Sequence, residues 1–254
     1  MRFAVAVIHT RPFSGPYLDS MVGLVKPAGG FDFIRVPDLP VDQGREAVAE
    51  LFMQGGCEAL LQVDDDMILH PLTLERLASW KVDMVHALCA TRTYPPVVGL
   101  YQRQRVEDGR EVMEIERWQV LRWLLAHPEA MGRTPVVLVP RPADALVPTR
   151  VCGTGCLLVR REVFERVERP WFKCSARKHG EDFYFTGKAR EAGFQPYVDR
   201  SVIVGHEWGS ALAMPRDWVV TMLGEWVLAR LPHLLDGMGL WELVEPEEEQ
   251  EAEA

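Results

Sequence analysis

The chain has 254 residues, of which 48% are hydrophobic and 26% are charged, a composition typical of a globular protein. Its formal net charge is −9 at pH 7, but six of the negative charges are glutamates in residues 245–254, so the rest of the chain is close to neutral. This balance excludes the broad lysine and arginine field that duplex nucleic acid requires, and no stretch approaches the roughly 20 apolar residues of a transmembrane span.

The N-terminal apolar run, Phe3–Ile8, is too short for the hydrophobic region of a secretion signal and predicts a buried strand instead. The five cysteines are odd in number and scattered along the chain, which argues against a disulfide framework. We therefore expect a cytoplasmic protein with reduced thiols.

The first 90 residues alternate between β-rich apolar runs and segments with helical spacing of apolar residues. Such alternation predicts an α/β fold with a mostly parallel central sheet flanked by helices, in which ligands bind at the carboxyl ends of the strands. The predicted strands are Phe3–Ile8, Phe31–Val36, Ala59–Val63 and Met84–Ala90, and the predicted helices begin at the caps Ser14 and Asp42 and at Pro71.

The pattern becomes irregular between residues 91 and 150 and regular again after Val151. Near the C-terminus, Val220, Leu223, Val227 and Leu231 lie on one stripe of a predicted helix over 217–231, which suggests core packing or a homo-oligomer contact. The predicted elements here are helices over 115–127, 161–167 and 181–193 and strands over 135–140, 151–159 and 195–206.

Three consecutive acids, Asp64, Asp65 and Asp66, directly follow the third predicted strand. If the extended backbone continues, Asp64 and Asp66 point to one side, where their oxygens suit a hard divalent cation such as Mg²⁺ or Mn²⁺. The alternative is that these acids cap the next helix and otherwise face solvent.

Two further polar groups are candidates for the same site. Glu181 and Asp182 begin a predicted helix, where a carboxylate is placed to take a proton from a hydroxyl, although acids are also ordinary at helix starts. His206 follows an apolar strand; it is either structural or a nitrogen ligand that shifts the preference of the site from Mg²⁺ to Mn²⁺.

The order of these segments, with "VDDDM", "GTGCLLVRREVF" and "GEDFYFTGKAREAG" followed by "VIVGH", resembles the GT-A fold glycosyltransferases that use nucleotide sugars, especially those of family 2. The resemblance implies one domain over 1–244, with a nucleotide-binding half (1–90), an acceptor and catalytic half (91–210) and a helical extension (211–244). It leaves residues 245–254 as a disordered acidic tail.

The resemblance also implies roles for particular residues. Asp66, Asp64 and His206 would hold the metal, and Asp182 would be the catalytic base, with Glu181 beside it. The expected donor-binding residues are His9, Thr10, Arg11, Arg45, Asp64, Asp65, Gly153, Thr154 and Gly155.

The implied activity is metal-dependent transfer of a sugar from a nucleoside-diphosphate sugar to an acceptor hydroxyl, with inversion if a single carboxylate base acts. We expect the site to prefer Mn²⁺ over Mg²⁺. One alternative is a nucleotidyltransferase, although "HTRPFSGPY" lacks the glycine-rich, lysine-containing loop usual after the first strand. Another is a non-catalytic nucleotide- or carbohydrate-binding module, which we would expect to have lost one of the two acidic motifs.

Overall fold

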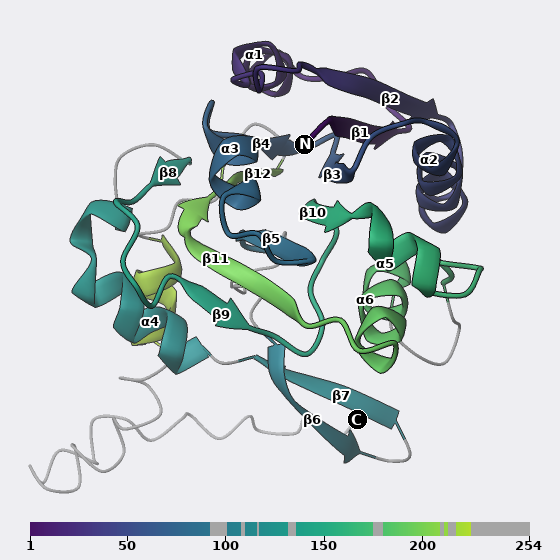
Figure 1. Ribbon diagram of the computed structural model, residues 1–254. Coiled ribbons are helices and arrows are strands. Elements are labelled where there is room, and N and C mark those ends of the chain that lie inside the picture. The colour runs from purple at the N-terminus through teal and green to yellow at the C-terminus, as the bar shows by residue number, and fades with distance from the viewer. Residues whose placement is uncertain are drawn as a thin grey trace, which may run out of the picture.

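The computed structural model describes residues 1–91, 101–107, 110–115, 117–131, 136–174, 180–208, 211–212 and 217–224. The predicted acidic tail and most of the predicted C-terminal extension lie outside these residues. Figure 1 shows a central twisted sheet with helices on both faces.

The central sheet has eight strands, in the order β2-β1-β3-β10-β5-β11-β8, with β9 also paired to β11. Strands β2, β1 and β3 are mutually parallel, and so are β5 and β11, while β10 runs antiparallel between β3 and β5. The mostly parallel sheet expected from the sequence is confirmed. Its strands are β1 (Phe3–His9), β2 (Phe31–Pro37), β3 (Ala59–Asp64), β5 (Met84–Leu88), β8 (Val137–Leu138), β9 (Leu146–Pro148), β10 (Cys156–Arg160) and β11 (Pro196–Ile203).

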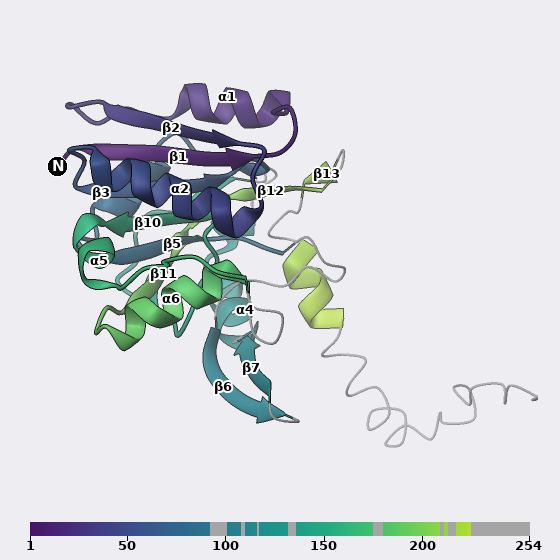
Figure 2. The same cartoon turned by 90° about the vertical axis from the view of Figure 1, so that its right-hand side faces the viewer.

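Two small sheets accompany the central one. Strands β4 (Met67–Ile68), β12 (Gly205–Trp208) and β13 (Ala211–Leu212) form the first, and β6 (Tyr101–Glu107) pairs with β7 (Arg110–Ile115) in the second. The β6–β7 hairpin, which the sequence did not predict, projects from one end of the molecule in Figures 1 and 2.

Helices cover both faces because alternate residues of the central strands are apolar on each side. Ala4 and Ala6 of β1 join one core cluster with α2, α5 and α6, while Val5 and Val7 join another with α1 and α3. Figure 2 shows α2, α5 and α6 in front of the strands. The helices are α1 (Gly15–Gly23), α2 (Val41–Gln54), α3 (Thr73–Ala78), α4 (Arg117–Ala126), α5 (Arg161–Arg166) and α6 (Glu181–Glu191), with a 3₁₀ turn at Pro128–Met131.

The sequence predicted some ends of helices and strands correctly and others incorrectly. The Ser14 hydroxyl accepts the Tyr17 N–H at 3.0 Å, which confirms the predicted cap of α1. The cap of α2 is Pro40 rather than Asp42, which lies in the first turn of the helix. The predicted strand over 151–159 begins only at Cys156, because Gly153 and Gly155 form the loop that leads into it.

Core packing of the predicted C-terminal stripe is wrong in its described part, 217–224, whereas the homo-oligomer contact stays a prediction. Val220 is 70% exposed and Leu223 is 39% exposed, whereas Trp218, Val219 and Met222 pack into the third core cluster. Residues 225–231, with the rest of the stripe, lie outside the described residues.

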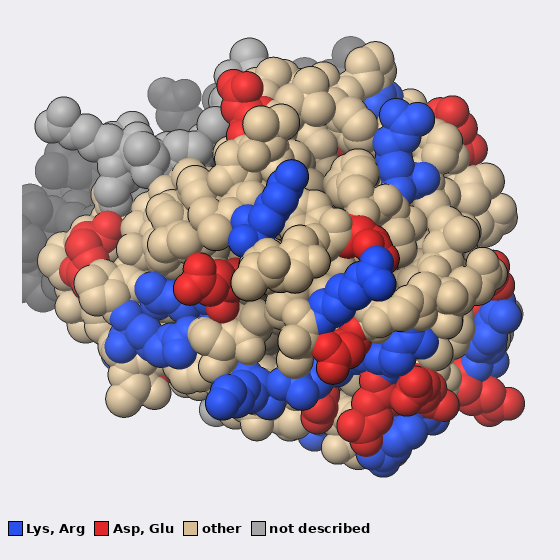
Figure 3. Space-filling model, turned by 45° about the horizontal axis from the view of Figure 1, so that its top comes forward, with Lys and Arg blue, Asp and Glu red and all other residues tan. Residues whose placement is uncertain are grey.

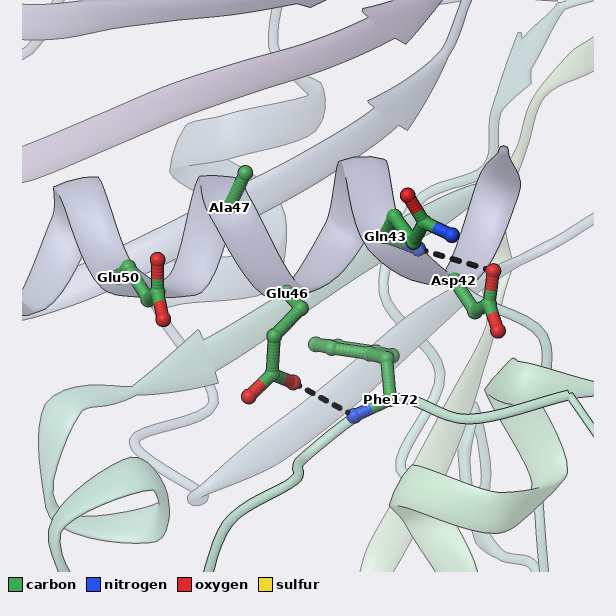
Figure 4. A pocket seen from close by; sticks show the side chains of 6 residues that line it. All are labelled: Asp42, Gln43, Glu46, Ala47, Glu50 and Phe172. Atoms are coloured by element: carbon green, nitrogen blue, oxygen red, sulfur yellow. Dashed lines mark hydrogen bonds between the residues drawn. The ribbon is translucent and has the colours of Figure 1, made fainter. Parts of the chain in front are cut away.

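An acidic face of α2 anchors the segment 169–174, which connects α5 to α6 (Figure 4). Both Glu46 Oε2 contacts are short: the backbone N–H groups of Trp171 and Phe172 donate to it at 2.9 Å. Glu50, one turn later on α2, makes only an ion pair with Arg169 among the contacts described for its side chain. Glu46 therefore ties the segment before α6 to α2, which packs on β1 and β2.

Replacing Glu46 with Ala should destabilise the protein by about 2–4 kcal/mol, because it leaves two backbone N–H groups without their charged acceptor. Glu50→Ala is the matched control and should cost less than about 1 kcal/mol, as expected for an exposed ion pair. Urea unfolding of both variants tests this; equal destabilisation of the two would contradict the anchoring role of Glu46.

Candidate active site

Most of the candidate residues meet at the carboxyl ends of the parallel strands. β1 ends at His9 and β3 ends at Asp64, and the antiparallel β10 begins beside Val63 of β3. In Figure 2 the arrowheads of β1 and β2 point toward the side of the molecule where β12 and β13 lie. A pocket at this edge is lined by Ile8, His9, Thr10, Leu39, Val41, Arg45, Asp64, Asp65 and Asp66.

The three residues of the acidic triplet, Asp64, Asp65 and Asp66, lie partly in a strand and partly in a turn. Asp64 is the last residue of β3, and Asp65 and Asp66 form the turn between β3 and β4. The expected strand alternation through Asp66 is therefore wrong, because the extended backbone stops at Asp64. As a result the three carboxylates have different partners.

Arg45 binds the first of these carboxylates and is almost completely buried, at 3% exposure. Its Nη2 lies 2.6 Å from Asp64 Oδ1 and its Nε lies 2.9 Å from Glu181 Oε1. Burial alone lowers the pKa of Arg45, but the nearby charges of Asp64 and Glu181 outweigh it and hold the pKa above the usual value. Arg45 was expected to approach the nucleotide; the structure places it as the counter-ion that joins α2, β3 and α6.

Asp66 and His206 lie side by side although they are far apart in the sequence. The pairing of β12 with β4 puts His206 opposite Met67, and the Glu207 N–H donates to the Asp66 carbonyl at 2.9 Å. The side chains meet as well, with His206 Nε2 lying 3.4 Å from Asp66 Oδ1.

The orientation of the imidazole fits a metal ligand. His206 Nδ1 lies 2.7 Å from the Ala90 carbonyl, so this nitrogen carries the proton and donates it. Nε2 then faces the carboxylate of Asp66, an arrangement that suits a cation shared by the two atoms and equally suits a hydrogen bond from a protonated Nε2. Neighbouring ligands of one cation with bonds of about 2.1 Å lie roughly 3 Å apart, close to the distance seen.

The full expected ligand set is not assembled. Asp64 faces Arg45 rather than His206, and the described part of the chain contains no group of three or more His, Cys, Asp or Glu side chains that could hold a metal ion. Asp66 and His206 remain as two candidate ligands, a number at which Mg²⁺ and Mn²⁺ sites are usually completed by phosphate oxygens and water.

Glu181 and Asp182 begin α6, as predicted, but their surroundings differ. Glu181 is fixed by Arg45, and Cys174 Sγ lies 3.8 Å from its other oxygen. Asp182 accepts the N–H of its neighbour Phe183 at 2.7 Å, and no basic side chain lies within ion-pair distance of it in the described structure. Burial, and then the charge of Glu181, raise the pKa of Asp182 to about 6.

The loop from Gly153 to Gly155 lies between these groups. A Cβ built on Gly153 would lie 3.7 Å from His86 Nε2 and 3.8 Å from Asp182 Oδ2. A Cβ on Gly155 would lie only 2.6 Å from Met67 Cε and 3.2 Å from Asp64 Oδ2, so this position requires glycine or a shift of its neighbours. Thr154 is buried, and its hydroxyl has no hydrogen-bond partner among the described residues.

The loop after β1 forms the other wall of the pocket. His9 Nδ1 lies 3.3 Å from the Arg11 carbonyl, and Thr10 is exposed at the rim. Arg11 Nη2 lies 3.4 Å from Asp65 Oδ1 and 3.3 Å from Asp66 Oδ2. The three loop residues expected to contact the donor thus border the acidic turn.

Sequence reasoning missed two buried polar residues of the site. Gln62 and His86 are each 2% exposed and both pair with Leu157 of β10, so they lie in one row across the sheet. Burial lowers the pKa of His86 to about 4, so its imidazole is neutral near pH 7. A polar residue inside an otherwise apolar strand, as in "LLQVD" and "MVHAL", was the available signal.

The charged surface gives no sign of a nucleic-acid interface on the face in Figure 3, where the described Lys and Arg side chains are interspersed with Asp and Glu. Within the described residues, none of the helices is both long enough and apolar enough to span a membrane.

Comparison with known proteins shows similarity in structure. No family model matches the sequence, and no curated protein matches it significantly. The crystal structure of A197 from STIV matches with a TM-score of 0.57 and 15% identity, over 85% of this chain and 92% of that one. The structure of GalNAc-T7 with UDP, GalNAc and Mn²⁺ matches with a TM-score of 0.53 and 12% identity, over 81% of this chain and 43% of that one.

These similarities show that the chain has a GT-A-like glycosyltransferase fold, as the sequence predicted. Membership of family 2 stays a prediction. The fold alone does not assign the donor, the acceptor or the metal.

Replacing Arg45 with Met should destabilise the protein by about 3–5 kcal/mol, because it leaves Asp64 and Glu181 without their buried counter-ion. The loss should be smaller at pH 5 than at pH 8, because the two abandoned carboxylates would bind protons more readily in the folded state. Arg2→Met, which removes an exposed ion pair with Asp32, should change the unfolding free energy little. A pH-independent loss in Arg45→Met would contradict this account.

Proposed function

We propose that the protein is a metal-dependent glycosyltransferase that moves a sugar from a nucleoside-diphosphate sugar to an acceptor hydroxyl. The observation that carries the proposal is the pair formed by Asp66 and His206, in which the bond to Ala90 turns the Nε2 lone pair toward a carboxylate. GalNAc-T7, whose structure contains UDP and Mn²⁺, has the same kind of fold.

The pocket at the strand ends has a volume of about 180 Å³, which holds part of a nucleotide. Ile8, Leu39 and Val41 give it apolar walls, against which a base and ribose can pack. Asp66 and His206 would hold the cation, with a preference for Mn²⁺ over Mg²⁺ because one ligand is an imidazole nitrogen. Once bound, the cation would neutralise the negative charge that develops on the departing diphosphate.

Asp182 is the base that we assign to the acceptor. The acceptor hydroxyl attacks the anomeric carbon, its proton passes to the Asp182 carboxylate, and the bond to the nucleoside diphosphate breaks with its electron pair leaving on the phosphate oxygen. Such a single displacement inverts the anomeric configuration. Glu181 does not share this role, because Arg45 binds it.

The two alternative functions have weaker support. The loop between β1 and α1, residues 10–14, contains neither a glycine nor a lysine, both of which a nucleotidyltransferase would be expected to carry there. A non-catalytic binding module would have no need for a buried carboxyl poised to ionise near neutral pH, and Asp182 is such a group.

We also place the protein in the cytoplasm. All five cysteines are free, and four of them lie buried or half-buried in the fold, so no disulfide contributes to stability. This is the thiol state expected in a reducing compartment.

Metal-dependent nucleotide binding should require both members of the metal pair. Titration of UDP, GDP and dTDP into the protein by calorimetry, with and without Mn²⁺, should reveal at least one nucleotide whose affinity rises with the metal. Asp66→Asn and His206→Gln should each lower that affinity at least 10-fold. His127→Gln, directly after α4 and outside the site, is the matched control; unchanged affinity in His206→Gln would refute the assigned metal ligand.

The rate should rise with pH through about 6, because the base must be ionised and burial favours its neutral form. The measurement is kcat/KM for Mn²⁺-dependent hydrolysis of the matching nucleotide sugar between pH 4.5 and 8. Asp182→Asn should lower kcat about 10²–10⁴-fold while nucleotide affinity is kept. Glu191→Gln, an exposed acid at the end of the same helix, should leave the profile unchanged; a flat profile in the wild type would contradict the role of Asp182.

A further inference from the structure

The acidic turn is balanced by a cation that belongs to the chain itself. Arg11 extends from the loop after β1, and its Nη2 atom lies between Asp65 Oδ1 and Asp66 Oδ2, at 3.4 and 3.3 Å. Arg45 forms an ion pair with Asp64, the first residue of the triplet. All three carboxylates therefore have an arginine nearby, but the ion pairs of Arg45 are shorter than those of Arg11.

Arg45 is buried and makes short contacts, whereas Arg11 is held loosely. The Arg11 side chain is 49% exposed, and a single nitrogen makes both of its long contacts, without the parallel pair of hydrogen bonds found in strong arginine–carboxylate pairs. The Arg11 carbonyl accepts from His9 Nδ1 at 3.3 Å, so the backbone has a contact of its own that does not involve the guanidinium. Displacing the guanidinium therefore breaks only its two long contacts with Asp65 and Asp66.

The position of Arg11 conflicts with a cation on Asp66. Asp66 Oδ1 faces His206 and Asp66 Oδ2 faces Arg11, so one carboxylate contacts both side chains. A metal ion about 2.1 Å from this carboxylate would lie within a few ångströms of the guanidinium, in a site where Asp66 is only 5% exposed. Two positive charges so close together repel each other, and the burial of Asp66 limits the screening by water on one side.

The buried hydroxyl of Tyr17 is close enough to the acidic turn to interact with its charges. Tyr17 of α1 is 1% exposed, and among the described residues its hydroxyl has no hydrogen-bond partner. Burial first, and then the charges of Asp65, Asp64 and Asp66, raise the pKa of Tyr17. A buried hydroxyl of this kind is a group that a water or a ligand can bind.

We propose that Arg11 is a displaceable counter-ion that occupies the acidic turn in the free protein and competes with the divalent cation for Asp65 and Asp66. The inference rests on the proposed metal site. It makes binding of the bare metal weak, and it frees the Arg11 guanidinium at the mouth of the pocket when the metal arrives, where a diphosphate can accept its hydrogen bonds. Metal and nucleotide then bind better together than either does alone.

The test is the affinity for Mn²⁺ without nucleotide, measured from the electron paramagnetic resonance signal of free Mn²⁺ at low ionic strength. Arg11→Gln should bind Mn²⁺ about 5-fold tighter or more than the wild type. Arg11→Lys keeps the competing charge and should stay within about 2-fold of the wild type. Arg2→Gln, the removal of an exposed arginine elsewhere, should have no effect.

The outcomes separate this inference from the proposed function. Equal Mn²⁺ affinity in the wild type and Arg11→Gln, with binding lost in Asp66→Asn, would overturn the competition and leave the metal site standing. Weaker binding in Arg11→Gln would likewise overturn it. Absence of Mn²⁺ binding in the wild type and in Arg11→Gln alike would overturn both the inference and the proposed metal site.

Discussion

The arrangement of this site depends on one buried guanidinium. Arg45 links a strand end to a helix start through Asp64 and Glu181, which lie 117 positions apart in the sequence, and it takes one carboxylate from each acidic motif. The other member of each motif, Asp66 or Asp182, makes no contact with Arg45 among the contacts described. Adjacent acids thus have different partners: one residue of each motif holds the fold together, and its neighbour is the one to which we assign a catalytic or metal-binding role.

The topology of the sheet brings the remaining parts together. Because β10 runs antiparallel between β3 and β5, the glycine loop that precedes it reaches the same edge at which the parallel strands end. The short pairing of β12 with β4 then brings His206 to the turn that contains Asp66. Each of these contacts joins segments more than 60 residues apart, so the site forms only when the whole sheet has formed.

Much of the framework could be predicted from the sequence because it depends on local patterns. Apolar runs predicted the strands, and the Ser14 cap predicted the start of α1. The start of β10, the β6–β7 hairpin and the cap at Pro40 were missed, because glycine-rich and polar segments have no single conformation until they pack. The acidic residues were recognised as candidates, but their partners were not: the bonds from Arg45 to Glu181 and from His206 to Ala90 depend on tertiary contacts that no local pattern encodes.

The central claim is that Asp66 and His206 bind one divalent cation that carries the donor diphosphate. Anomalous diffraction from crystals grown with Mn²⁺ and the nucleoside diphosphate that binds tightest tests it most directly. The account predicts one strong manganese peak about 2.0–2.2 Å from both Asp66 Oδ1 and His206 Nε2, in contact with phosphate oxygens. A bound nucleotide with no manganese between these two side chains, or with His206 turned away from Asp66, would contradict it.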